Sequence, residues 1–139
     1  MIILDTCVIS ESLKPSPSAA LLGWIDSIPE EQAYLPSIVL GELQKGVELL
    51  ANGKRRQALR VWLEQLKRRF SGRILSFDEE SAIIWGDLSA RRIRQEKPTP
   101  AIDGMIAAIA IKHDALLATR NAKDFAETGV KLVNPFATR

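Results

Sequence analysis

The hydrophobic and polar positions of the chain form two kinds of segment that alternate. Short runs are apolar throughout, and in longer segments an apolar residue recurs every three or four positions. The short runs predict buried β-strands, and the longer spacing predicts amphipathic helices. Strands are predicted at residues 1–4, 33–35, 73–77, 115–119 and 131–134. Helices are predicted at residues 8–13, 17–28, 37–51, 56–70, 79–96 and 101–111, with a further short helix in the loop at 120–125. This alternation favours an α/β fold with a parallel sheet covered on both faces.

Local signals refine several of these elements. The strand at residues 1–4 is apolar at every position, which is typical of the central strand of a parallel sheet. Ser37 is expected to cap the helix that it begins, and Trp62 is expected to face the core. The inner face of the helix at 79–96 is expected to use Ala82, Ile83, Trp85 and Leu88.

The composition is that of a globular protein of one-domain size. The chain has 139 residues, of which 46% are hydrophobic and 26% are charged, so we expect a single domain over residues 1–139. No apolar run approaches the ~20 residues that a membrane span needs, and Met1 leads directly into a strand rather than into a secretion signal. A location in the cytoplasm is therefore expected. The single Cys7 cannot form an internal disulfide, which agrees with a reducing compartment.

The formal net charge of +2 is too small to indicate a nucleic-acid-binding protein by itself. Basic residues nevertheless gather in two groups, at 54–73 and at 91–97. Solvated helix faces are the commoner explanation for such runs, and a surface that follows a phosphate backbone is the alternative.

Asp5 comes directly after the apolar run at residues 1–4. In open α/β sheets, ligands bind outside the carboxyl ends of the strands, so a carboxylate there lies where chemistry usually takes place. The alternative is that Asp5 and Thr6 only cap the helix that follows. The position alone leaves both interpretations open.

Three further acidic residues stand in unusual places. Glu42 falls in the apolar stripe of its helix, where a charge is costly unless it is paired or binds a metal, although it could also lie at the edge of the stripe and pair with Lys45. Asp103 is the one polar residue between 101 and 111, where an N-terminal cap is the competing explanation. Asp124 lies in the polar loop after the fourth predicted strand.

If these four acids meet at one edge of the sheet, they need cations or protons, because two carboxylates about 5 Å apart repel by roughly 3 kcal/mol at an effective dielectric of 20. Oxygen ligands without histidine favour Mg²⁺ or Mn²⁺, and such an ion can activate a water molecule and hold a phosphate. A haloacid-dehalogenase-type phosphatase would need an Asp where Cys7 stands, and no phosphate-binding glycine loop follows the first strand. His113, the only histidine, lies at a helix end and is expected to be structural, which argues against a Ser-His-Asp triad.

Four segments together carry a family resemblance. They are LDTCVISE at 4–11, GELQKG at 41–46, DGMIAA at 103–108 and TRNAKDF at 119–125. In this order and spacing they resemble the PIN-domain toxin ribonucleases of the VapC type, over nearly the whole chain. The resemblance implies a three-layer α/β/α fold with a central parallel sheet of four to five strands.

The resemblance also implies an Mg²⁺-dependent endoribonuclease, with Mn²⁺ as an alternative ion, that cuts RNA as the toxin of a type II toxin–antitoxin pair. Carried over by motif, Asp5, Glu42, Asp103 and Asp124 would form the acidic pocket. Asp5 and Asp103 would bind the metal directly, and Glu42 and Asp124 could join them, while Thr6 and Asn121 would orient the ligands through hydrogen bonds. The family often has Asn where this chain has Cys7.

The family further implies a homodimer that is inhibited by a small antitoxin, often through an Arg inserted into the acidic pocket. The alternative from another functional class is a non-catalytic module that uses the fold only to bind an antitoxin or RNA. A DNA-directed flap-type nuclease is disfavoured, because the chain lacks the length for a DNA-binding arch.

Overall fold

Five short parallel strands form one sheet at the centre of the molecule. The computed structural model describes residues 1–137. The strands are β1 (Ile2–Leu4), β2 (Ala33–Pro36), β3 (Ile74–Leu75), β4 (Leu116–Ala118) and β5 (Lys131–Val133), in the spatial order β3-β2-β1-β4-β5. The predicted α/β fold with a central parallel sheet is confirmed, and the strand at the start of the chain is its central strand, as its uninterrupted apolar sequence predicted.

The register of the strands decides which residues leave the sheet together. Ile3 lies opposite Tyr34 of β2 and Leu117 of β4, and Leu4 lies opposite Ala118. Because all the strands are parallel, their carboxyl ends lie at one edge. Asp5 after β1 and the residues after β4 therefore emerge side by side, and the Asp5 N–H donates to the Ala118 carbonyl at 3.0 Å.

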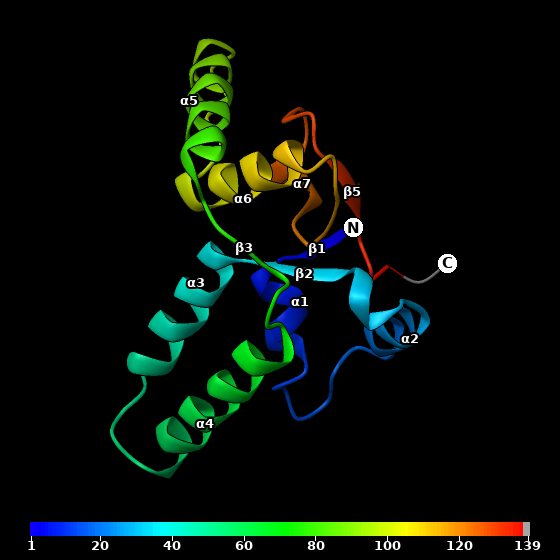
Figure 1. Cartoon of the computed structure of the whole chain (residues 1–139), viewed down its shortest axis with the longest axis vertical. Coiled ribbons are helices and arrows are strands. Elements are labelled where there is room, and N and C mark those ends of the chain that lie inside the picture. The colour runs from blue at the N-terminus through cyan, green and yellow to red at the C-terminus, as the bar shows by residue number, and fades with distance from the viewer. Residues whose placement is uncertain (138–139) are drawn as a thin grey trace.

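Helices cover both faces of this sheet (Figure 1). In the view of Figure 1, α5 and α6 lie above β1, β2 and β3, and α1, α3 and α4 lie below them. The helices are α1 (Thr6–Glu11), α2 (Ala19–Ser27), α3 (Ser37–Glu48), α4 (Lys54–Arg69), α5 (Glu79–Arg94), α6 (Ala101–Lys112) and α7 (Ala122–Phe125), with a 3₁₀ turn at Glu30–Gln32. Within residues 1–137, no helix is both long and apolar enough to cross a membrane.

The core lies between the sheet and these helices. Ile3, Leu35 and Leu117 from the sheet are fully buried, as are Ile106 and Ile109 of α6. Burial of α6 on nearly all sides follows from its composition, since a helix that is apolar all round requires an apolar environment. The buried helix α6 therefore holds Asp103, the acidic residue of its first turn, in a fixed position.

Some local predictions were wrong. Ser37 does not cap α3, because Pro36 is the N-cap; the Ser37 hydroxyl instead accepts the Phe77 N–H at 3.2 Å and ties the helix start to the chain beyond β3. Leu88 is buried as predicted, and Ala82 and Trp85 are half-buried, but Ile83 is 64% exposed. Ser81 and Arg92 are the other buried residues of α5, and neither was predicted.

Candidate metal-binding active site

Asp5 is the N-cap of α1, and both of its carboxylate oxygens have partners. The residue is only 4% exposed. One oxygen, Oδ1, accepts the N–H of Thr6 at 2.8 Å, and the other, Oδ2, accepts the hydroxyl of Thr119 at 2.7 Å. The capping interpretation is therefore correct for one oxygen. The second oxygen is directed to the end of a neighbouring strand, which a helix cap alone does not require.

Thr119 supplies this second contact from the end of β4. Its side chain is fully buried, and its hydroxyl donates to Asp5 while accepting the backbone N–H of Asn121 at 3.0 Å. Thr119 had no predicted role of its own. The available signal was its place, since a hydroxyl directly after a buried strand lies at the same sheet edge as Asp5.

Glu42 reaches the same region from α3. The Thr6 hydroxyl donates to Glu42 Oε1 at 2.6 Å, so its partner here is Thr6 rather than Lys45. The side chain is half-buried, because the buried stripe of α3 runs through Val39, Leu43 and Val47 and leaves Glu42 at its edge. A short charge-assisted hydrogen bond of this kind fixes the carboxylate between α1 and α3.

Asp103 lies in the first turn of α6 and is half-buried. It does not cap the helix, since the N-cap is Pro100 without a side-chain bond. Burial raises the pKa of Asp103 to about 6, and the negative charges of Asp5, Asp124 and Glu42 act in the same direction. All three other predicted acids therefore lie within electrostatic reach of Asp103.

The segment after β4 contributes Asn121 and Asp124. Asp124 is an exposed residue of the short helix α7, and its backbone N–H donates to the Asn121 carbonyl at 3.0 Å. The Asn121 side chain makes no capping bond to α7, and its backbone, through Thr119, is the part that connects to Asp5. The orienting role expected of the Asn121 side chain therefore stays a prediction.

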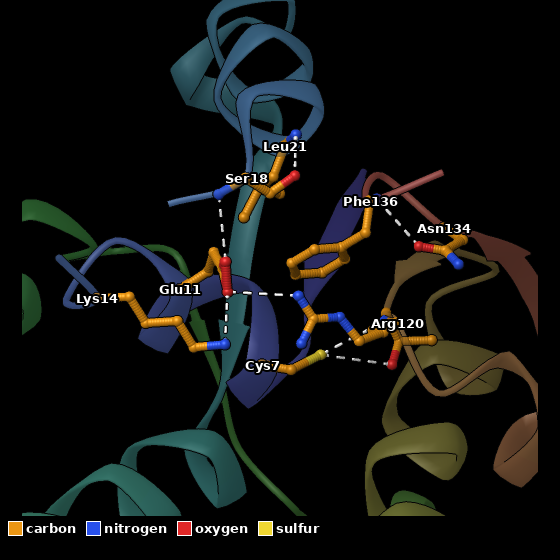
Figure 2. Close-up of polar contacts among 9 residues, drawn as sticks. Cys7, Glu11, Lys14, Ser18, Leu21, Arg120, Asn134 and Phe136 are labelled. Carbon is orange, nitrogen blue, oxygen red and sulfur yellow. Dashed lines mark hydrogen bonds and ion pairs between the residues drawn. The ribbon is translucent and has the colours of Figure 1, made fainter. Parts of the chain in front are cut away.

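Cys7 lies beside Asp5 and the segment after β4. Its sulfur is 3.7 Å from Asp5 Oδ2 and 3.7 Å from the Thr119 hydroxyl. The sulfur also accepts the Arg120 N–H at 3.4 Å, and Figure 2 shows Cys7 beside Arg120. Burial, with the nearby Asp5 charge, raises the pKa of the Cys7 thiol above its ordinary value. The thiol therefore stays protonated at neutral pH, where it is a weak donor and not a thiolate ligand.

The donor set fits a hard divalent cation. The four carboxylates repel one another, so a bound cation stabilises them. Their oxygen atoms are the ligands that Mg²⁺ and Mn²⁺ prefer. As the side chains are oriented in residues 1–137, no three of the His, Cys, Asp and Glu side chains already converge as a metal site. A groove of about 530 Å³ that is lined in part by Thr6, Glu42 and Lys45 lies alongside.

Comparison with known proteins identifies the family of this chain. The family described as the PIN domain matches residues 2–131. Toxin FitB of Neisseria gonorrhoeae (strain ATCC 700825 / FA 1090) is 42% identical over 98% of this chain and 99% of its own length. VapC ribonuclease Y4jK of Sinorhizobium fredii (strain NBRC 101917 / NGR234) is 38% identical over 98% of each.

A solved structure gives the same assignment. One chain of the structure described as FitAB bound to an IR36 DNA fragment superposes with a TM-score of 0.95 at 40% identity, covering 100% of this chain and 98% of that one. The resemblance inferred from the four sequence segments is confirmed. The chain therefore belongs to the PIN-domain family, and its relatives over nearly their whole length are named as toxins and VapC ribonucleases.

Proposed function

We propose that this protein is a metal-dependent endoribonuclease and the toxin of a type II toxin–antitoxin pair. The observation that carries the proposal is that hydrogen bonds through Thr6 and Thr119 bring Asp5, Glu42 and the loop of Asp124 together at one edge of the sheet, where their charges act on the half-buried Asp103. A group of mutually repelling acids at the carboxyl edge of a parallel sheet costs stability, and a cation makes it favourable. The names of the relatives supply the substrate, RNA, and the toxin role.

In the proposed site, Asp5 and Asp103 bind Mg²⁺, or Mn²⁺ in its place, with Glu42 and Asp124 completing the acidic pocket. When bound, the cation supplies charge neutralisation for the scissile phosphate and lowers the pKa of a water molecule. The protein orients the ligands. Thr119 and the Thr6 N–H hold the two oxygens of Asp5, and the Thr6 hydroxyl holds Glu42.

Two protein partners are part of the proposal. The structures of related proteins are described as FitAB and VapBC complexes, some of them bound to DNA. We infer that this chain likewise binds a small antitoxin, and that a cationic side chain of the antitoxin inhibits it by neutralising the acidic pocket. We also propose that it is a homodimer and acts in the cytoplasm.

Metal removal and readdition tests the proposal. Purified protein is expected to cut RNA with Mg²⁺ or Mn²⁺, to stop when EDTA is added, and to resume with excess metal. Expression without an antitoxin is expected to arrest growth. The alternative, a non-catalytic module that binds an antitoxin or RNA, predicts neither cleavage nor growth arrest under any metal condition.

A further inference from the structure

Glu11, the last residue of α1, is a buried carboxylate outside the acidic pocket. It is only 3% exposed, and a buried charge is unfavourable unless it is paired and hydrogen-bonded. Its oxygens accept from Lys14 Nζ at 2.9 Å, from the Ser18 N–H at 3.2 Å and from Arg120 Nη2 at 3.3 Å (Figure 2). The pKa of Glu11 is lowered, first by the hydrogen bond from Lys14, so the group is ionised at neutral pH.

Arg120 connects this carboxylate to the segment that follows β4. Its guanidinium also lies over the ring of Phe136, 3.9 Å from the ring centroid, as Figure 2 shows. Its backbone N–H donates to the Cys7 sulfur at 3.4 Å. One residue therefore contacts α1 twice, through its backbone at Cys7 and through its side chain at Glu11, and its guanidinium also contacts the C-terminal segment.

The neighbours of Arg120 explain why these contacts matter. Thr119, before it, donates to Asp5, and Asn121, after it, donates its backbone N–H to Thr119. The acidic pocket thus depends on how α1 and residues 119–121 sit relative to each other. The bond from Thr119 to Asp5 is one connection between them, and the ion pair of Glu11 with Arg120 is a second, further along α1.

We propose that Glu11 and Arg120 are positioning residues for the acidic pocket. Their ion pair, supported by Phe136, holds residues 119–121 against α1 and so fixes the orientation of Asp5 for cation binding. Neither residue contacts the cation or the reacting phosphate. This inference rests on the proposed function, because it states what the ion pair does for that site.

A direct contact with RNA is the competing role for Arg120, whose side chain is 45% exposed. The two roles differ in their kinetics. If Arg120 binds a phosphate, Arg120→Gln raises KM and Glu11→Gln has no effect. If the pair positions the pocket, both variants lower kcat and weaken cation binding. A positioning pair also predicts that the double variant is no worse than either single one, because each already breaks the same connection.

The test uses Glu11→Gln, Arg120→Gln, the double variant and Phe136→Leu. Lys131→Gln is the matched control, since it breaks the 2.9 Å ion pair with Asp114, which does not involve α1 or residues 119–121. The measurements are Mn²⁺ affinity by titration calorimetry, hydrogen exchange at the Arg120 and Asn121 amides, and kcat and KM on RNA. Phe136→Leu keeps an apolar side chain but removes the ring on which the Arg120 guanidinium stacks. This variant remains informative if Glu11→Gln does not fold.

Substitution of residues that orient metal ligands typically lowers metal affinity or activity by 10- to 100-fold. The Glu11 and Arg120 variants are therefore expected to lose about 10-fold in Mn²⁺ affinity and in kcat. Phe136→Leu should lose less, KM should stay within about twofold, and exchange at both amides should accelerate. If the Glu11 and Arg120 variants still cut RNA and bind Mn²⁺ as tightly as the wild type, the positioning role is overturned while the proposed function stands. Wild-type protein that binds Mn²⁺ but cuts no RNA would overturn the proposed function, while the affinity comparison would still decide the role of the pair.

Discussion

Thr119 and Asp5 lie 114 positions apart in the sequence, yet the Thr119 hydroxyl donates to Asp5 Oδ2 at 2.7 Å in the buried interior. The parallel pairing of β1 with β4 makes this possible, since Leu4 lies opposite Ala118 and the next residue of each strand leaves the sheet at the same edge. The hydroxyl also accepts the Asn121 N–H, so it connects Asp5 to the loop that leads to Asp124.

Replacing Thr119 by Val should lower cleavage activity by about 10- to 100-fold, because Asp5 loses a partner that fixes its orientation. Stability should fall by about 1–3 kcal/mol, since the Asn121 N–H and one Asp5 oxygen are left without this bond. Thr119→Ser keeps the hydroxyl and is the control. Urea unfolding and initial cleavage rates measure both effects, and a Val variant as active as the Ser variant would contradict this role.

The raised pKa of Asp103 predicts how stability depends on pH. In the folded protein this pKa is about 6, whereas an Asp in an unfolded chain titrates near 3.9. Between these values the folded state holds a proton that the unfolded state has released. The proton bound to Asp103 therefore stabilises the folded state. This contribution to the free energy of unfolding is fully present below about pH 4 and disappears as pH rises through 6.

Asp103→Asn removes this titration and should make the protein without added metal more stable at pH 7 than the wild type. The expected difference is on the order of 1 kcal/mol, after a discount for solvent screening of a half-buried side chain. Urea unfolding of both proteins at pH 4.5 and pH 7 measures it, because effects of other titrating groups largely cancel in the comparison. A difference that does not grow with pH would contradict the raised pKa.

Thr6→Val should release Glu42, whose Oε1 accepts the Thr6 hydroxyl at 2.6 Å. We expect cleavage to fall about 10-fold, with a smaller effect for Thr6→Ser, since the serine hydroxyl can still donate. The concentration of Mn²⁺ that gives half-maximal activity should rise in the Val variant. Equal metal dependence in the Val and Ser variants would show that this hydrogen bond does not prepare the site.

Gly104→Ala should strain the packing of α6 against α5. A Cβ at Gly104 would lie 3.2 Å from two atoms of the Trp85 indole, which is tighter than an ordinary contact. We expect a decrease in stability of about 1 kcal/mol, since overpacking outweighs the better helix propensity of alanine. Gly86→Ala in α5 is the control, because nothing lies within 4 Å of its Cβ position and it should stabilise slightly. Thermal melting and tryptophan fluorescence distinguish the two variants, and equal melting temperatures would contradict the expected strain.

Much of the fold was predictable because hydrophobic periodicity is a local property of the sequence. The strand at residues 1–4 and the buried helix α6 are apolar enough that only a central position suits them. The spatial order of the strands, β3-β2-β1-β4-β5, depends on crossover connections that local patterns do not encode. The two-residue strand β3 is shorter than its predicted run because only Ile74 and Leu75 pair with β2.

The acids of the candidate site were predictable because a charge in an apolar setting is conspicuous. Asp103 is the single polar residue in an apolar segment, and Asp5 ends an apolar strand. The groups that hold these acids were harder to predict. Thr119 is the last residue of a predicted strand, and Arg120 is an ordinary residue of the polar loop that follows. Their contacts, with Asp5 and with Glu11 of α1, form only when distant segments pack together.

In the proposed function, the acidic pocket that includes Asp5 cuts RNA with the help of a divalent cation. The most direct measurement compares RNA cleavage by purified wild-type protein and by Asp5→Asn across a range of Mn²⁺ concentrations, with melting curves to show that both are folded. We predict cleavage that rises with Mn²⁺ in the wild type and falls at least about 100-fold in Asp5→Asn, a decrease on the scale typical of essential catalytic groups. Equal cleavage by the two proteins, or none by the wild type at any Mn²⁺ concentration, would contradict metal-dependent cleavage through Asp5.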